Sequence, residues 1–275
     1  MSARPWVPEL DGVRGLAVLA VVVHHVYPWE RIGGPALSLL ALGWSGVDLF
    51  FVLSGFLITG ILLDTAHQPR FWRRFAIRRA LRILPLYWPL VGLVLAWHLA
   101  TATPTAAPPA AYPLFLCNWW IAWMPKFGDL PLNIAWSLAI EEQFYLTWPP
   151  LVRWLPARLL PAALACTLVA APVARWLVGG DPGADGADGY LPAYLLTPCR
   201  MDAIGWGCAA MLAWRAGGAW VSVPARAAGP LVLSLAALAV TVGWDREAAW
   251  FRVGGYTALA ATAAAALLAV RDGRW

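Results

Sequence analysis

Long apolar stretches alternate with short segments rich in proline, glycine and charge along the whole chain. A helix needs roughly 20 mostly apolar residues to cross a bilayer, and several stretches approach or exceed that length. The candidate spans are Leu10–Tyr27, Trp44–Leu63, Ile83–Leu99, Ile134–Leu155, Leu159–Val178, Asp202–Trp214, Pro230–Val242 and Trp250–Val270. The short alternating segments typical of a β-barrel are absent from the sequence. The pattern predicts an all-α, polytopic transmembrane bundle of about eight spans, forming one domain over residues 1–275.

Arginine positions predict the orientation of this bundle. Six of them lie between the second and third spans: Arg70, Arg73, Arg74, Arg78, Arg79 and Arg82. Because positive residues near span ends favour the cytoplasmic side, this loop is expected to be cytoplasmic. Eight spans then place both termini there. We therefore expect a multi-pass protein of the cytoplasmic (inner) membrane with a cytoplasmic N-terminus.

Composition agrees with this class and excludes others. The chain is 61% hydrophobic and 13% charged, with a mean hydropathy of +0.63. Its net charge of +5 is concentrated at the ends of apolar stretches, so no nucleic-acid partner is expected. The four cysteines, Cys117, Cys166, Cys199 and Cys208, lack the spacing of a metal site or a disulfide framework and read as apolar fillers.

The first apolar stretch, LDGVRGLAVLAVVVHHVY, carries ionisable groups. Arg14 and His25 are eleven residues apart, almost three helical turns, and therefore share one face. His24 points about 100° away from that face. Ionisable groups within a membrane helix usually face a protein interior or a wet cavity. We expect Arg14 and His25 to look into a shared interior.

The second stretch reads GWSGVDLFFVLSGFLITG. Asp48, Gly55 and Thr59 lie at i, i+7 and i+11 and share a stripe. Asp48 could hydrogen-bond an imidazole or pair with an arginine. Gly55 would let another backbone or a ligand approach, and helix packing is the simpler interpretation for it and for Thr59.

A basic run, FWRRFAIRRALRILPLYW, enters the third span. Arg78 and Arg79 each lie about one turn from Arg82, and guanidinium forks bind phosphate in bidentate fashion. Such a cytoplasmic pocket would suit a nucleotide-bearing donor. Attraction to anionic lipid together with topology setting is the alternative, and spacing alone favours it.

Three further acidic residues stand in apolar surroundings. Glu141 and Glu142 lie in WSLAIEEQFYLTW and, being adjacent, point to different faces. A carboxylate that orients an imidazole makes it a better base, so Glu141 is a candidate partner of His25, and a structural ion pair is the alternative. Asp202, in TPCRMDAIGWGCAA, is a candidate cap of the sixth span.

Five segments together resemble the acyltransferase 3 family of multi-pass bacterial membrane O-acyltransferases. They occur in family order and read LDGVRGLAVLAVVVHH, GVDLFFVLSGFLITGILL, RRFAIRRALRILPLYW, WSLAIEEQFYL and CRMDAIGWGCAA. Arg14 and His25 match the family pattern of arginine, ten residues, histidine. Arg79 and Arg82 match its arginine, two residues, arginine pattern.

The resemblance implies transfer of an acyl group, usually acetyl, from cytoplasmic acyl-CoA to a hydroxyl of a carbohydrate or cell-envelope glycan. Acyl-CoA is a co-substrate, and neither a bound cofactor nor a metal is expected. His25 would be the essential histidine and Glu141, or else Asp48, its orienting acid. The donor-site arginines would be Arg14, Arg78, Arg79 and Arg82. The remaining candidates, structural or substrate-binding, are His24, Ser54, Gly55, Trp136, Glu142, Arg200 and Asp202.

Two departures accompany the resemblance. Family members typically continue for about two more spans, whereas this chain stops at RDGRW, so we expect a domain without them. Some members carry an extracellular hydrolase-like domain, which a separate protein would supply here. A proton-coupled transporter or exporter is the main competing function, because buried ionisable residues also form proton relays. An inactive membrane scaffold is the other.

Overall fold

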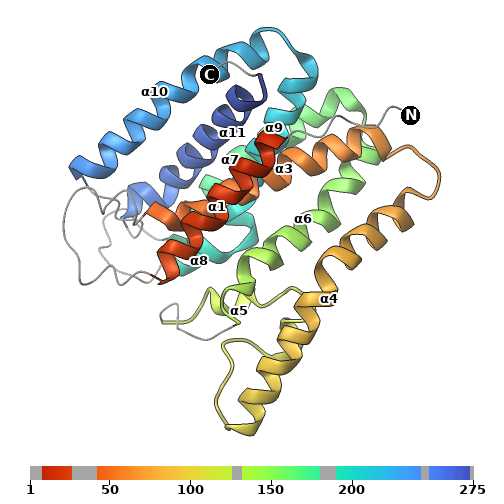
Figure 1. Cartoon of the computed structure of the whole chain (residues 1–275), viewed down its shortest axis with the longest axis vertical. Coiled ribbons are helices and arrows are strands. Elements are labelled where there is room, and N and C mark those ends of the chain that lie inside the picture. The colour runs from red at the N-terminus through yellow and green to blue at the C-terminus, as the bar shows by residue number, and fades with distance from the viewer. Residues whose placement is uncertain (1–7, 27–41, 126–131, 180–189, 243–247, 273–275) are drawn as a thin grey trace.

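The computed structural model describes residues 8–26, 42–125, 132–179, 190–242 and 248–272 (Figure 1). Within those ranges the regular structure is helical and contains no strand, which confirms the all-α class. The longer helices are α1 (Pro8–Val26), α3 (Gly46–Thr65), α4 (Phe71–Ala100), α6 (Ala135–Trp154), α7 (Leu160–Gly179), α9 (Thr197–Ala216), α10 (Ala219–Val242) and α11 (Tyr256–Asp272). The short ones are η2 (Leu42–Ser45), η3 (Pro109–Ala111), α5 (Asn118–Ile121), η4 (Ala157–Leu159), α8 (Tyr190–Leu195) and the π-turn η6 (Phe251–Gly255).

Four helical segments of the described chain are long and apolar enough to cross a membrane: Leu42–Thr65, Phe71–Ala100, Ala157–Gly179 and Phe251–Val270. These four segments support the prediction that the chain is a membrane protein. The other long helices, α1, α6, α9 and α10, have 19 to 24 residues and carry the remaining predicted spans. The total of about eight spans stays a prediction.

Two helix starts differ from the sequence prediction. Helix α4 begins at Phe71, so the basic run lies inside the helix and not in a loop before it. Helix α9 begins at Thr197 with Pro198 in its first turn, where a missing N–H costs nothing. Asp202 therefore lies well inside α9, and the prediction that it caps this helix is wrong.

Helix α3 is the central element, and it packs most closely on α9. A Cβ at Gly55 would collide with the carbonyl oxygen of Ile204, and one at Gly207 with that of Val52. Two glycines thus bring the two backbones together, as small residues do in membrane helices. The packing role expected of Gly55 is confirmed. Thr59 accepts a hydrogen bond of 2.9 Å from the indole N–H of Trp148, which adds α6 to this core.

Contacts between helices define two opposite ends of the bundle. At the end we call the histidine end, His24 near the end of α1 packs on Gly43 of η2, and Trp44 packs on Tyr194 and Tyr256. The starts of α3, α9 and α11 therefore lie together there. At the opposite end, here the basic end, Asp64 of α3 pairs with Arg215 of α9 at 2.6 Å.

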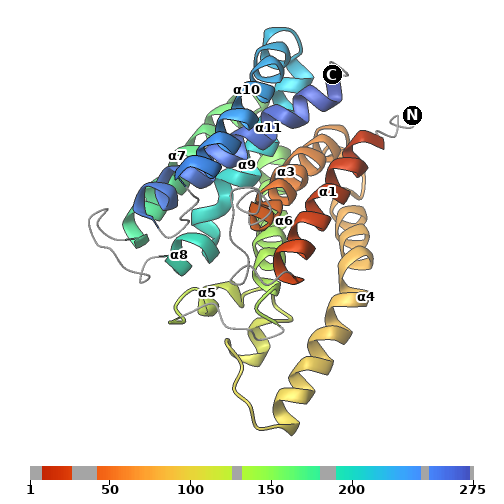
Figure 2. The ribbon, with the colours of Figure 1, turned by 60° about the vertical axis from the view of Figure 1, so that its left-hand side comes forward.

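Helix α4 leans away from the bundle (Figures 1 and 2). Only 17% of its most apolar window is buried inside the protein, against 61% for the segment that contains α3. Its contacts to the rest include two aromatic pairs, Trp72 with Trp154 and Tyr87 with Phe115.

Candidate functional site

Helix α1 packs through a stripe that includes Leu10, Ala17 and His24. Leu10 and Ala17 are buried and His24 is half-buried, whereas His25 is exposed. Arg14, whose side chain is 36% exposed, pairs with Asp11 at 2.7 Å. The described residues therefore do not enclose Arg14 and His25, and the expectation that the two look into a shared interior stays a prediction.

The hydrogen bond of His25 fixes its tautomer. Its Nδ1 lies 2.8 Å from the carbonyl oxygen of Val21. A carbonyl oxygen only accepts, so Nδ1 carries the proton and Nε2 has a free lone pair. In the neutral imidazole, Nε2 is therefore the basic nitrogen.

A polar cluster joins α3, α4 and α6. The hydroxyl of Ser54 donates to Oε1 of Glu141 at 2.6 Å, and the hydroxyl of Tyr145 lies 3.4 Å from Oε2 of Glu141 and from Oγ of Ser54. The guanidinium of Arg79 lies over the Tyr145 ring, 4.7 Å from its centroid. We call Ser54, Arg79, Glu141 and Tyr145 the glutamate cluster. Ser54 and Tyr145 are the hydrogen-bond partners that the described structure gives Glu141, and its pairing with His25 stays a prediction.

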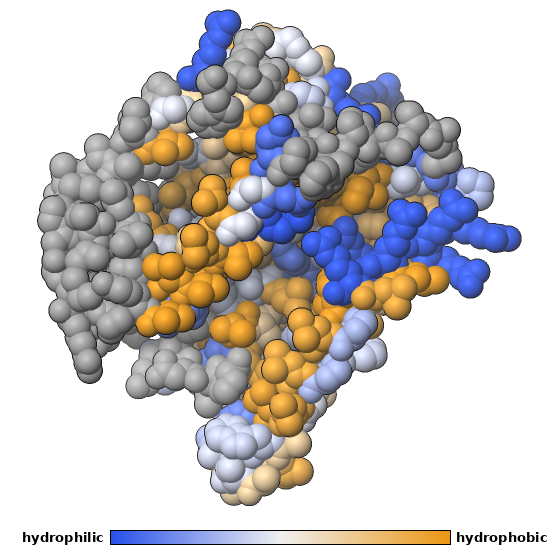
Figure 3. Space-filling model, in the orientation of Figure 1, coloured by the Kyte–Doolittle hydropathy of each residue, from blue (hydrophilic) through white to orange (hydrophobic). Residues whose placement is uncertain are grey.

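The remaining residues of the basic run face outward. Arg78 and Arg82 are exposed and Arg79 is half-buried against the bundle. Figure 3 shows a hydrophilic surface over the first half of α4, where Arg73 and Arg74 are also exposed. Arg79, one residue from Arg78 and three from Arg82, connects this exposed basic surface to the glutamate cluster.

Glu142 points away from the glutamate cluster, as adjacent helical residues must. It is half-buried, and its Oε1 has no hydrogen-bond partner among the described residues. Its function stays a prediction.

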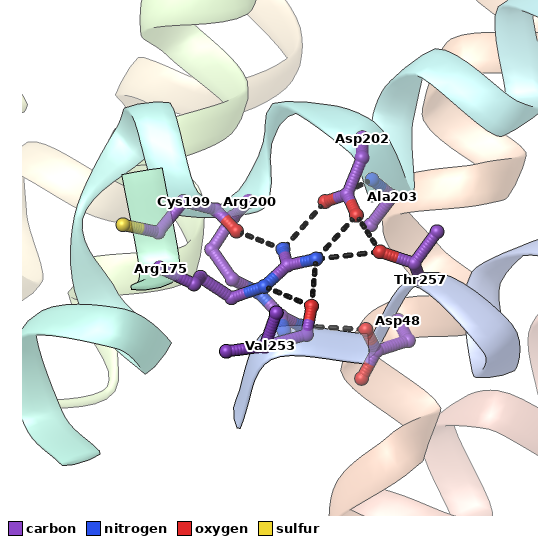
Figure 4. A network of polar contacts seen from close by, with 8 residues as sticks. All are labelled: Asp48, Arg175, Cys199, Arg200, Asp202, Ala203, Val253 and Thr257. Atoms are coloured by element: carbon purple, nitrogen blue, oxygen red, sulfur yellow. Dashed lines mark hydrogen bonds and ion pairs between the residues drawn. The ribbon is translucent and has the colours of Figure 1, made fainter. Parts of the chain in front are cut away.

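A saturated ion pair ties α7, α9 and α11 together (Figure 4). Arg175 contacts both carboxylate oxygens of Asp202, at 2.9 and 2.8 Å, and also the hydroxyl of Thr257 at 2.5 Å. The carbonyl oxygens of Val253 and Cys199 accept further N–H groups of Arg175. Sequence reasoning missed Arg175 as a site residue, although a lone arginine in AAPVARWLVG was the available signal.

A second buried pair joins α3 to α9. Arg200 donates to Oδ1 of Asp48 at 2.6 Å, and both side chains are at most 2% exposed. The structure thus gives Asp48 an arginine partner, one of the two alternatives that its position left open. Trp136, whose ring lies beside Phe51 and Tyr194, belongs to the aromatic surroundings of this pair.

The cysteines behave as fillers in the described part of the chain. Cys117, Cys199 and Cys208 are buried and Cys166 is exposed, and no group of three metal-ligating side chains was found among the described residues. In the segment after α4, burial raises the pKa of the Cys117 thiol to about 12. That thiol is therefore protonated and unreactive at neutral pH.

Comparisons with known proteins give consistent matches. A family model described as an acyltransferase domain matches residues 7–273. The peptidoglycan O-acetyltransferase OatA of Listeria monocytogenes is 33% identical over 232 residues, which cover 77% of this chain and 35% of OatA. The putative peptidoglycan O-acetyltransferase YrhL of Bacillus subtilis is 33% identical over 226 residues, covering 76% of this chain and 33% of YrhL. The O-acetyltransferase OatA of Staphylococcus aureus is 32% identical over 183 residues. The chain thus spans about a third of the length of these relatives. No solved structure matches it.

Proposed function

Because the chain belongs to the acyltransferase 3 family, we propose that it transfers an acetyl group from acyl-CoA to a hydroxyl of a cell-envelope glycan. Three similar proteins carry the name O-acetyltransferase, two of them with peptidoglycan as the named acceptor. The glutamate cluster supports the proposal, since Arg79 of the basic helix α4 lies over Tyr145, which belongs to the same cluster as the Glu141 carboxylate held by Ser54.

The predicted orientation of the chain in the membrane would place the two substrates on opposite sides of the bilayer. The arginines of the basic end would face the cytoplasm, where acyl-CoA is made, and α1 would run outward from a cytoplasmic N-terminus. The histidine end would then face the outer side of the bacterial inner membrane. A cytoplasmic donor would serve an outer acceptor through the membrane domain, with a separate extracytoplasmic hydrolase-like protein as its partner.

Arginines of α4 would bind the donor. Arg78 and Arg82 are exposed and can turn both N–H forks to the phosphates of acyl-CoA. Arg79 is held over Tyr145, so it would contribute a positioned charge. Arg14, already paired with Asp11, would extend this basic surface along α1.

Transfer requires one proton acceptor. The acceptor hydroxyl attacks the thioester carbonyl, a new C–O bond forms, the C–S bond breaks, and coenzyme A leaves as its thiol after receiving a proton. His25 would take the hydroxyl proton on Nε2, the nitrogen left free by the Val21 contact. Glu141, fixed by Ser54 and Tyr145, would supply the negative charge that stabilises the resulting imidazolium.

The test is transfer from radiolabelled acetyl-CoA to cell-wall glycan by the full chain in liposomes. We expect His25→Gln to lower the rate by at least about 100-fold, since general-base catalysis contributes about 10²–10⁴-fold. His24→Gln is the matched control, because His24 packs against Gly43. We expect this variant to keep most of the activity. Normal transfer by His25→Gln would remove His25 from the mechanism.

A transporter is the second candidate function, favoured by the buried Arg–Asp pairs. Uptake of a labelled glycan into liposomes without covalent acetylation would support it and count against the transferase.

A further inference from the structure

Two buried Arg–Asp pairs each have one member on α9, and they differ in how many of their polar atoms form hydrogen bonds. Every nitrogen of the Arg175 guanidinium donates at least one hydrogen bond, and both oxygens of Asp202 accept. That pair is a closed network. The Asp48–Arg200 pair is held by the single contact from Nη2 to Oδ1.

The second pair and the neighbouring Tyr256 contain polar atoms that form no hydrogen bond. Nε and Nη1 of Arg200, Oδ2 of Asp48 and the hydroxyl of Tyr256 are all buried without a hydrogen-bond partner among the described residues. Arg200 and Tyr256 are in contact, since the guanidinium carbon lies 4.4 Å from the ring centroid. An unpaired buried polar atom destabilises the fold, so a group of four calls for a ligand that binds there.

Aromatic rings enclose these atoms. Tyr194 and Phe51 lie 5.1 and 5.7 Å from the guanidinium carbon of Arg200. Trp44 stands edge-on to Tyr194 and Tyr256, with centroids 6.4 and 5.9 Å away. The enclosure therefore combines apolar ring faces with hydrogen-bonding groups at its centre.

The polar atoms select the chemistry of the ligand. Arg200 offers donors, Asp48 offers an acceptor and Tyr256 offers both. The pair is neutral overall, so an anion gained at Arg200 would be repelled by Asp48. A hydroxyl both accepts from a guanidinium and donates to a carboxylate, and the C–H faces of a sugar ring pack well on aromatic rings. Neighbouring hydroxyls of a neutral sugar fit this set.

We propose that the Asp48–Arg200 pair and its aromatic enclosure bind a neutral sugar unit of the acceptor through its hydroxyl groups, an inference that rests on the proposed function. The pair lies at the histidine end, the end that would face the outer acceptor. Trp44, Tyr190 and Tyr194 are 5–7% exposed, whereas Arg200 and Tyr256 are 0% exposed. A sugar would therefore have to displace some of these buried rings to reach the pair.

Calorimetric titration of the full chain in lipid nanodiscs tests the site without any need for turnover. The probe is the neutral tetramer of N-acetylglucosamine, with inorganic phosphate as the anionic comparison. The double variant Asp48→Asn/Arg200→Gln removes both charges while keeping similar shapes, so no charge is left buried alone. We expect saturable sugar binding by the native chain, at least about tenfold weaker binding by the double variant, and no phosphate binding at this site.

The matched control is Asp64→Asn/Arg215→Gln, which removes an ion pair of the same length at the opposite end. It should bind the sugar as the native chain does. Equal sugar affinity in the native chain and in Asp48→Asn/Arg200→Gln, or no binding by either, overturns the proposal. Phosphate binding that the same substitutions abolish also overturns it, in favour of an anion site.

Kinetics separates this proposal from the proposed function. If the chain is an acetyltransferase, Asp48→Asn/Arg200→Gln should raise the KM for the glycan, whereas the control Asp64→Asn/Arg215→Gln should leave that KM near the native value. A chain that binds the sugar but never transfers acetyl contradicts the proposed function alone. A chain that transfers acetyl with an unchanged glycan KM contradicts only the sugar site.

Discussion

At the scale of single residues, hydrogen-bond partners separate side chains that the sequence treats alike. His24 and His25 are neighbours, yet His24 packs against Gly43 whereas His25 is exposed and contacts the Val21 carbonyl through Nδ1. Glu141 and Glu142 divide in the same way, because Ser54 and Tyr145 fix only the first. The chemistry that a side chain can perform follows from these contacts.

Cys117 gives a prediction at this scale. With a pKa of about 12, only about one molecule in ten thousand carries the Cys117 thiolate at pH 8, and the thiolate is the reactive form. We expect N-ethylmaleimide to leave Cys117 unmodified in the native chain at pH 8 and to modify it after denaturation in SDS, as read by mass spectrometry of the tryptic peptides. Modification of native Cys117 as fast as that of a free cysteine would show that the thiol is not buried.

At the scale of elements, the contact between α3 and α9 decides how the other helices are placed. Gly55 and Gly207 allow the two backbones to meet, and the Asp48–Arg200 and Asp64–Arg215 pairs bind the same helices near both ends. The candidate sugar site and the glutamate cluster therefore lie on one central helix, α3, and its position affects both.

Replacing either glycine should disturb this contact. In Gly55→Ala and Gly207→Ala the new methyl group meets a backbone carbonyl, which cannot rotate away, and overpacking of a core costs about 1–3 kcal/mol or more. We expect a lower melting temperature in detergent for both variants. Gly92→Ala in α4 is the control, since a Cβ there meets nothing within 4 Å and alanine favours the helix. Unchanged melting of Gly55→Ala would argue against this helix contact.

At the scale of the whole molecule, a buried polar network holds together helices that are distant in sequence. Arg175 of α7, Asp202 of α9 and Thr257 of α11 meet at one point, and α4 leans away from the same bundle (Figures 2 and 4). The molecule thus consists of a bundle tied by ion pairs and a basic helix that diverges beside it.

The Arg175–Asp202 pair should be structural, in contrast to Asp48–Arg200. Arg175→Gln leaves the Asp202 carboxylate buried with Thr257 alone among its side-chain partners, and breaking a buried pair costs about 3–5 kcal/mol. We expect a large fall in melting temperature for Arg175→Gln and partial recovery in Arg175→Gln/Asp202→Asn. Glycan affinity of the protein that remains folded should not change. A sugar-binding defect without loss of stability would assign this pair to a binding site.

The sequence by itself determined the helical class, the apolar segments and the shared face of Arg14 and His25, because helical period and hydropathy are local properties. It also carried the resemblance to the acyltransferase 3 family, and the comparisons confirm that family. Only the tertiary structure decided which face of α1 packs, and that Asp48 meets Arg200, Glu141 meets Ser54, and Arg175 meets Asp202. Those partners lie 27 to 152 residues apart in the sequence. They are determined by which side chains fit between two packed helices, and residue spacing along a single helix does not reveal that.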